Sequence, residues 1–164
     1  MRSIGLVALR LCATLVLLSA VGPAAAAHAD NSRLNRSVIT NVYAVQHQAG
    51  CPAGVKWNVQ LQLAAEWHTR DLMEHRDMQG HIGSDGSTVM DRTRAAGFSG
   101  QTVETVAINP ALAINGIEIM NQWFSDPVAL AVMRDCSHSA IGVWSENSLD
   151  RTVVVAVYGV QVPA

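Results

Sequence analysis

Histidines, carboxylates and cysteines are the side chains of this sequence that could bind a metal ion or catalyse hydrolysis. The chain has no His-Glu-x-x-His segment, no Gly-x-Ser-x-Gly segment and no recognisable Cys-His nucleophile signal, so the common local signatures of zinc peptidases and of serine and cysteine hydrolases are missing. His68 and His75 are seven residues apart and would share one face of a helix, but two helical turns is a long span for one ion. We expect this pair to lie on a solvated or half-buried face.

Cys51 and Cys136 are expected to form a disulfide. The chain has three cysteines, and Cys12 lies in an N-terminal segment that should be removed, so an even pair remains. An even pair in an exported chain is typical of a disulfide, and two separate buried thiols are the alternative. Two distant cysteines supply too few ligands for a structural metal site.

The N-terminal segment 1–29 has the order of a secretory signal peptide. Arg2 and Arg10 precede an apolar run over 11–21, and small residues follow over 24–29, which is the charged, apolar and small-residue pattern of such signals. The apolar run is too short to span a bilayer comfortably, so a retained transmembrane helix is the less favoured alternative. Cleavage is expected after Ala29 or after Ala27, and residues 30–164 should form one secreted domain.

The charge balance of the mature chain argues against nucleic acid as a partner. Removal of Arg2 and Arg10 from the eleven basic residues leaves nine against thirteen acidic ones, a formal charge of about minus four. The sequence has no basic run, no flexible linker and no second apolar segment long enough to cross a membrane. A soluble extracellular protein without nucleic acid or a membrane span in the mature form is expected.

Hydrophobic spacing and helix caps predict three helices before any strand. A first helix is expected over 36–47, a second from the cap Asn58 to about His75, and a third that Ser87 caps and Gly97 ends in a left-handed conformation. In the core or at its edge we expect the four tryptophans, Trp57, Trp67, Trp123 and Trp144.

The second half of the chain predicts strands around one more helix. A short strand is expected over 103–108, and Asn109-Pro110 should start a fourth helix whose buried stripe contains Ile114, Ile117, Met120 and Trp123. The runs 140–145 and 152–160 are typical of a hairpin. The run 153–157 lacks polar alternation, so helices should cover both faces of the sheet.

Several segments together resemble the CAP superfamily, which comprises cysteine-rich secretory proteins, insect antigen 5, plant pathogenesis-related proteins and bacterial secreted members. The segments are 55–58 leading into a helix, His81-Ile82-Gly83-Ser84-Asp85-Gly86-Ser87, Arg94-Ala95-Ala96-Gly97-Phe98 and Ile141-Gly142-Val143. The resemblance covers residues 34–160, approximately. The resemblance implies an α+β fold, a three-layer α-β-α sandwich with an SCP-like domain.

The resemblance also implies a central cleft that usually carries two histidines and two acidic residues. His81 matches the first histidine. Glu104 matches the glutamate of a Gly-Glu-Asn turn, although Val103 and Thr105 flank it here. Asp126 is the further acidic candidate for this cleft.

Two alignments compete for the second histidine. The bacterial pattern Trp-x-x-Ser-Pro-x-His aligns with Trp123, Asp126 and Pro127, which puts Ala129 in the histidine's place and leaves His138 outside the cleft. The eukaryotic pattern aligns its histidine with His138 and its glutamate with Asp126. We prefer the first, because it also aligns the final strands, but only the second supplies two imidazoles, His81 and His138, for zinc or another divalent cation.

Two function classes follow from the resemblance. A secreted binding or interaction module, with a possible small-lipid site or an incomplete metal site in the cleft, is favoured and requires no cofactor. The alternative is a metal-dependent hydrolase acting on peptide or cell-wall material, so catalysis is the less favoured expectation. The expected partner is an extracellular ligand or protein that the residues do not identify, and a lipid is among the candidates.

Overall fold

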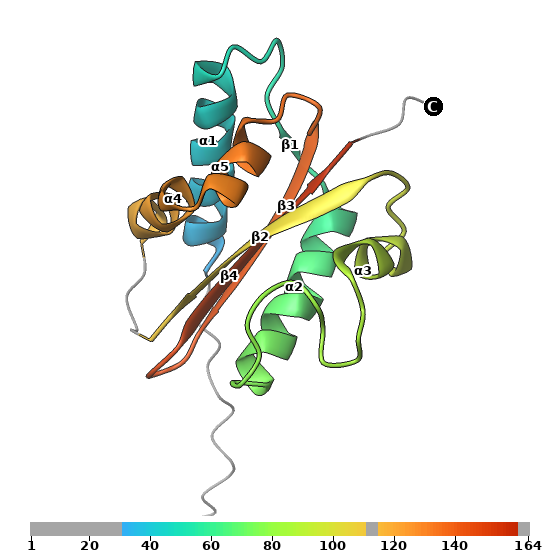
Figure 1. The fold of residues 1–164 in the computed structure, drawn as a ribbon, viewed down its shortest axis with the longest axis vertical. Helices are drawn as coiled ribbons and strands as arrows, with labels where there is room; N and C mark the ends of the chain where they lie inside the picture. The colour runs from blue at the N-terminus through green and yellow to red at the C-terminus, as the bar shows by residue number, and fades with distance from the viewer. Residues whose placement is uncertain (1–30, 111–114, 161–164) are drawn as a thin grey trace, which may run out of the picture.

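Two layers of helices enclose a four-stranded sheet in the computed structural model, which describes residues 31–110 and 115–160 (Figure 1). In chain order the elements are α1 (Ser32–Gln48), β1 (Lys56–Trp57), α2 (Val59–Glu74), α3 (Val89–Ala95), β2 (Thr102–Asn109), α4 (Gly116–Ser125), α5 (Pro127–Arg134), β3 (Ala140–Asn147) and β4 (Thr152–Gly159). The expected signal peptide and its cleavage site lie outside the described residues. Within the described part, no helix has the length and apolar character needed to cross a membrane.

The sheet has the strand order β1-β3-β4-β2. β1 runs parallel to β3, while β4 pairs antiparallel with both β3 and β2. Every residue of β4 is buried, because alternate side chains enter the two helical layers. Val154 and Ala156 belong to the core beneath α1, α4 and α5, whereas Val153 and Val155 belong to the core beneath α2 and α3. The predicted α+β sandwich and the predicted hairpin are confirmed.

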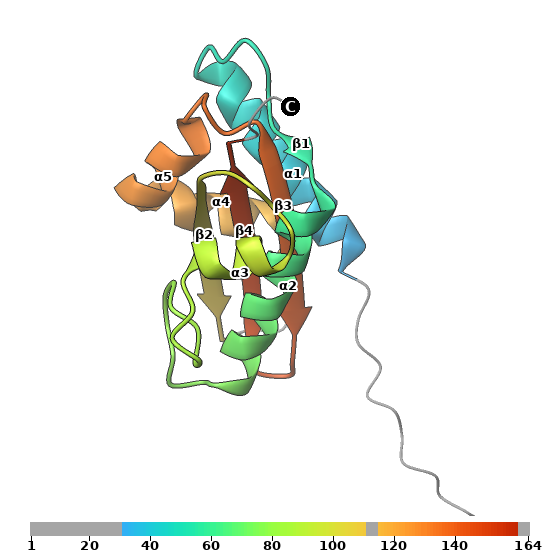
Figure 2. The same ribbon diagram turned by 90° about the vertical axis from the view of Figure 1, so that its right-hand side faces the viewer.

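Helix α2 lies unusually close to the sheet, and Figure 2 shows α2 and α3 in front of it. The side chain of Asn58 caps α2 by accepting a hydrogen bond from the Leu61 amide. A Cβ at Gly142 of β3 would lie 2.0 Å from the backbone nitrogen of Gln62. Only glycine therefore fits where the α2 backbone crosses β3.

Three details of the predicted elements were wrong. β1 precedes α2, so a strand does come before the second helix. Thr88, not Ser87, caps α3 in a capping box with Asp91. Asn109 does not start a helix, because it ends β2 opposite Thr152.

The helical segment after β2 is divided in two. Asn115 caps α4, and the side chain of Asp126 caps a separate helix, α5, with Pro127 at its first position. Ile117 was expected in the buried stripe of this segment, but it is 69% exposed. It lies in the first turn of α4, on the side away from the buried Ile119.

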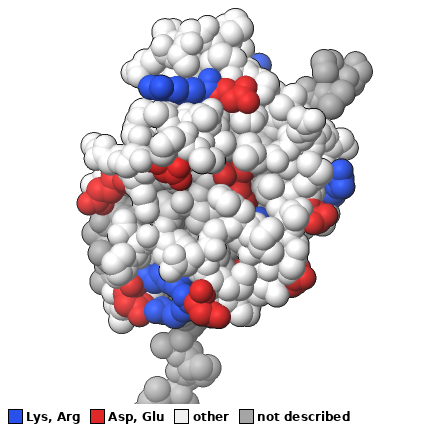
Figure 3. All heavy atoms as spheres, in the orientation of Figure 1, with Lys and Arg blue, Asp and Glu red and all other residues white. Residues whose placement is uncertain are grey.

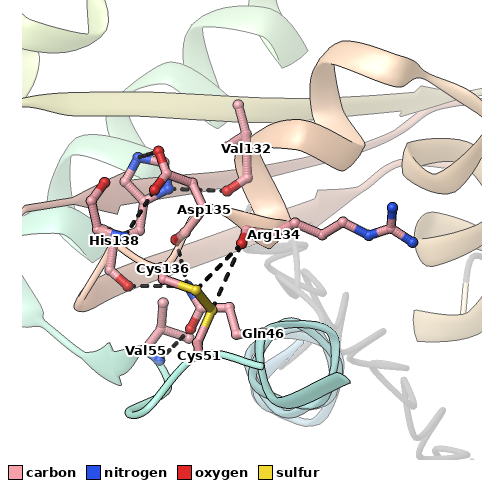
Figure 4. Close-up of a disulfide and its surroundings, with 9 residues drawn as sticks. Gln46, Cys51, Val55, Val132, Arg134, Asp135, Cys136 and His138 are labelled. Carbon is pink, nitrogen blue, oxygen red and sulfur yellow. Dashed lines mark hydrogen bonds and ion pairs between the residues drawn. A yellow bond between two sulfur atoms is a disulfide. The ribbon is translucent and has the colours of Figure 1, made fainter. Parts of the chain in front are cut away.

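A disulfide between Cys51 and Cys136 joins the end of the α1 region to the segment before β3, with the Cα atoms 5.2 Å apart (Figure 4). The buried side chain of Gln46 reinforces the same connection. Its amide nitrogen donates to the carbonyls of Asp135 and His138, and its oxygen accepts from the Val55 amide. The loop after α1 is thus bound covalently, and α1 itself by hydrogen bonds, to the segment that precedes β3.

Candidate functional site

A cleft of about 460 Å³ opens over β2, the strand at one edge of the sheet. His81 reaches it from the loop after α2, Glu104 from β2, and Asp126 from the junction of α4 and α5. The rest of the lining is mainly aliphatic and includes Val89, Val103, Val106, Ile108, Val128, Ala129 and Val132. Acidic side chains appear on the face shown in Figure 3, which is otherwise covered mainly by uncharged residues. The cleft therefore combines an apolar wall with a small set of polar groups, as small-molecule sites do.

Glu104 is the centre of the polar groups. Its side chain is buried, and its Oε1 atom lies 2.8 Å from Arg92 Nη2, 3.3 Å from His81 Nδ1 and 3.5 Å from His68 Nε2. The other oxygen, Oε2, is buried and has no hydrogen-bond partner within the described structure. One carboxylate oxygen thus accepts hydrogen bonds from Arg92 and His81, and the other is enclosed within the protein.

Arg92 balances the charge of Glu104. It lies on α3 with a residue exposure of 6%, and it also donates hydrogen bonds to the carbonyls of Ser87 and His81. The guanidinium therefore fixes the loop that carries His81 as well as the carboxylate. A buried carboxylate needs such a partner, since an unpaired charge in the interior is very costly.

His68 is fully buried, which corrects the expectation of a solvated or half-buried face. α2 turns this residue toward the sheet, where its Nε2–H donates to the Gly80 carbonyl at 2.9 Å and Nδ1 has no partner within the described residues. Burial lowers the pKa of His68, and the nearby Glu104 carboxylate opposes that shift only in part. His68 is therefore a neutral side chain next to the Glu104 carboxylate. His75, by contrast, lies at the exposed end of the helix, beside Asp71.

His81 lies at the surface of the cleft, with 58% of its side chain exposed. Its Nδ1–H donates to Glu104, and this hydrogen bond raises the pKa of His81 while partial burial opposes the rise. Because Nδ1 faces the carboxylate, Nε2 is the ring atom that can accept a proton or a ligand's hydrogen bond.

Asp126 and His138 differ in their relation to the cleft. Asp126 lines it and also accepts a hydrogen bond from the Val128 amide. His138 is not among the residues that line it: its Nδ1–H donates to the Val132 carbonyl (Figure 4). The centre of its ring lies 5.6 Å from that of the Tyr158 ring. Ala129, which the bacterial alignment put in the place of the second histidine, does line the cleft.

The polar groups of the cleft do not fit a zinc ion. Among residues 31–110 and 115–160, no three His, Cys, Asp or Glu side chains are grouped so that they could hold a metal. The guanidinium of Arg92 already lies 2.8 Å from Glu104, and this positive charge disfavours a second cation at the same carboxylate. His81 alone is a weak zinc ligand, because stable sites use three or four protein ligands.

The sequence reasoning did not identify Arg92 or His68 as part of the site. Both lie on helices, and their connection to Glu104 spans 12 residues for Arg92 and 36 for His68. A charged arginine on a helix is normally solvated, so nothing local marks Arg92 as buried. The burial of His68 could have been predicted, because it lies one turn from the buried Ala64, Ala65 and Leu72 on the same face of the helix.

Comparisons with known proteins bear on the fold. Neither a protein-family model nor a curated protein sequence matches this chain. Among solved structures, an outer surface protein from Borrelia burgdorferi is similar over 82% of this chain and 98% of its own, with a TM-score of 0.71 and 17% identity. An extracellular protein containing an SCP domain from Bacillus anthracis str. Ames is similar over 78% of this chain but 40% of its own, with a TM-score of 0.65 and 15% identity.

A zinc complex of NaASP2 is also similar, with a TM-score of 0.54 and 11% identity over 82% of each chain. At such identities the likeness concerns the fold and not the individual site residues. The chain has a CAP superfamily fold.

Proposed function

We propose that this chain is an extracellular CAP-type binding module, made of a domain over 30–164 after a signal peptide over 1–29, and that its cleft holds a small lipid bearing a hydroxyl group. The observation that carries the proposal is the cleft itself: its lining is mainly aliphatic, and the exposed side chains of His81 and Asp126 supply polar contacts. The extracellular assignment draws on the disulfide and on the outer-surface and extracellular proteins of similar fold.

The cleft matches a mostly apolar ligand in size and lining. Its volume of about 460 Å³ is within the range of about 300–1,000 Å³ that small-molecule sites occupy. Apolar area removed from water supplies the binding energy, at about 25 cal/mol per Å² before the costs of association. The valine and isoleucine side chains over β2 and α5 provide that area.

The polar group of the ligand is expected to be a hydrogen-bond donor. A carboxylate oxygen can only accept, so the exposed carboxylate of Asp126, which lines the cleft, pairs with an O–H or N–H of the ligand. An ionised fatty acid has no such donor, and its charge would face the carboxylates of Glu104 and Asp126. A neutral lipid alcohol such as a sterol satisfies the site, whereas a fatty acid does not.

The hydrolase alternative has less support. His81 with its Glu104 contact resembles an oriented base, since a carboxylate at Nδ1 leaves Nε2 able to take a proton. The described residues that line the cleft nevertheless include no serine or cysteine that could act as a nucleophile beside this base. Binding without turnover therefore fits these groups better.

The proposal is tested by measuring the binding of cholesterol and of palmitate to the mature protein and to two matched variants. Val128 and Ile117 are each the second residue of a helix, and they are 71% and 69% exposed, but only Val128 lines the cleft over β2. Val128→Glu should abolish cholesterol binding and Ile117→Glu should preserve it, while palmitate should bind weakly to all three proteins.

Two results would contradict the proposed function. One is failure of the parent protein to bind cholesterol, or binding that Val128→Glu leaves intact. The other is hydrolysis of a peptide, an ester or peptidoglycan by the parent, with or without added zinc, that is lost in a His81→Ala, His138→Ala double variant.

A further inference from the structure

A second groove, of about 640 Å³, lies at the opposite edge of the sheet from the cleft. We call it the β3-edge groove. Its floor is the end of β3, from Trp144 to Asn147, and its sides come from the first turns of α1, from β1 and from α2. β1 pairs only with Ala140 and Ile141 of β3, so the remainder of β3 is not covered by a neighbouring strand of the described chain on this side. The two sites share no lining residue.

Trp57 stands at the surface of this groove, which corrects the expectation that it lies in the core or at its edge. It is 57% exposed, and with Trp144 it gives this groove two indole groups. Its indole Nε1–H donates to Gln62 Oε1 at 2.6 Å. The ring is thereby held in one orientation, which reduces the entropy lost when a ligand stacks on it.

Trp144 is the second indole of the β3-edge groove. Its Nε1–H donates to Glu146, whose carboxylate also accepts from Arg70, and the Arg70 guanidinium lies 6.0 Å from the centre of the Trp144 ring. The orientation of this ring is likewise fixed by neighbours. The groove thus presents two indole groups whose polar N–H atoms are already bonded within the protein.

Planar polar side chains occupy the rest of the groove. Asn31, Asn35, Gln62 and Asn147 contribute amides, and Arg36 contributes a guanidinium. Amides can donate and accept at the same time, and Asn147 Oδ1 has no hydrogen-bond partner within the described residues. Arg36 Nε donates to a carbonyl one turn earlier on its own helix, and this arginine also lines the groove.

We propose that the β3-edge groove binds a saccharide built of pyranose rings. A pyranose has apolar C–H faces and a rim of hydroxyl groups that both donate and accept, which matches indole faces surrounded by amides. Several of these amides already form hydrogen bonds within the groove, as Asn31 does with Ser145 and Asn147, and the hydroxyl groups of a saccharide can extend this network where a lipid cannot. Arg70 of the groove is neutralised by Glu146 and Glu66, so a neutral ring is favoured over a polyanion.

The test measures the binding of three tetrasaccharides, built from β-1,4-linked glucose, β-1,4-linked N-acetylglucosamine and α-1,4-linked glucose, to the mature protein. Sorbitol serves as a polyol without a ring. Calorimetry should show saturable binding of at least one tetrasaccharide and none of sorbitol. Trp57→Ala should weaken this binding by about tenfold or more, because it removes the exposed stacking face.

Trp67→Ala is the matched control. Trp67 is also a partly exposed indole, at 38%, and lies on α2, but it does not line the β3-edge groove. Its replacement should leave tetrasaccharide binding unchanged, and Val128→Glu should leave it unchanged as well, since that residue lines the other cleft. Circular dichroism of each variant checks that the fold is retained.

The proposal is overturned if no tetrasaccharide binds, if sorbitol binds equally well, or if Trp57→Ala and Trp67→Ala have the same effect. The lipid experiment above has separate ligands and separate variants. Failure of saccharide binding therefore leaves the proposed lipid site standing, and failure of lipid binding leaves the saccharide site standing.

Discussion

Three nitrogen-bearing side chains surround one oxygen of the buried Glu104 carboxylate. Arg92 forms the shortest contact, 2.8 Å, and both residues of this pair are almost completely buried. An ion pair of this kind contributes little net stability when intact, because both groups lose their hydration. Breaking it is costly, since the remaining charge is left without compensation.

Replacing Arg92 by methionine should therefore destabilise the protein by about 3–5 kcal/mol. The same change at Arg76, whose pair with Asp150 is exposed, should have little effect. Urea denaturation of both variants measures the difference. An Arg92→Met/Glu104→Gln double variant should lose less than the two single variants together, and strictly additive losses would contradict direct coupling.

The stability contribution of His81 should depend on pH. The Glu104 hydrogen bond raises the pKa of His81 above its unfolded value of about 6.5, so the folded state binds this proton more tightly. The contribution is fully present below the unfolded pKa and is lost as the pH rises through the folded pKa. The difference in unfolding free energy between the parent and His81→Gln should be larger at acidic than at alkaline pH.

The comparison with His81→Gln is needed because the buried His68 also makes the stability depend on pH, with the opposite sign. Burial lowers the pKa of His68, so its effect on stability is unfavourable as the pH falls below the unfolded value. His68 is present in both proteins, and its contribution cancels to first order in the difference. Urea titrations at several values between about pH 5 and 9 would contradict the prediction if the difference stayed constant or grew on alkalinisation.

At the level of elements, the contact between α2 and β3 positions both candidate sites. α2 supplies His68 beneath the cleft and Gln62 and Arg70 to the β3-edge groove. Its distance from the sheet is set at Gly142, where the backbones come into direct contact. A change in this contact should therefore disturb stability and both sites together.

Gly142→Ala should destabilise the protein by about 3 kcal/mol, near the upper end of overpacking costs. The added Cβ meets the backbone of Leu61 and Gln62, which cannot move independently of the helix. Gly54→Ala is the matched control, because the atoms nearest its Cβ belong to the side chain of Tyr43, which is 50% exposed and can rotate away. Equal melting temperatures for the two variants would show that the α2 backbone does not limit this position.

For the whole molecule, the disulfide closes most of the described chain into one loop. Cys51 and Cys136 are separated by 85 residues, and the buried Gln46 links the same segments without a covalent bond. A loop of this length restricts the unfolded chain strongly in the chain-entropy model. The hydrogen bonds of Gln46 should keep the folded geometry when the disulfide is absent.

A Cys51→Ser/Cys136→Ser variant should fold but lose stability, by about 4 to 5 kcal/mol in the chain-entropy model. Thermal unfolding with and without a reducing agent provides the measurement. The reducing agent should lower the melting temperature of the parent toward that of the variant and leave the variant unchanged. If full reduction left the melting temperature of the parent unchanged, the predicted contribution of the disulfide to stability would be contradicted.

Local sequence patterns were sufficient for most of the elements, because caps and periodicity act over a few residues. Asn58 before an amphipathic run specified α2, and the apolar run 153–157 specified a strand buried on both faces. The prediction of a helix start at Asn109-Pro110 was wrong because the same pair also suits the end of an edge strand. In the structure Asn109 pairs with Thr152 of β4 and therefore belongs to the strand.

The polar centre of the cleft and the β3-edge groove were decided only by tertiary structure. His81 and Glu104 could be named from motifs, but the burial of Arg92 and His68 depends on which helix face meets the sheet. Trp57 is exposed because β1 has only two residues and leaves the sheet edge open. Sequence alone determines the periodicity and caps of each element, whereas burial and contact between distant residues arise from how those elements pack.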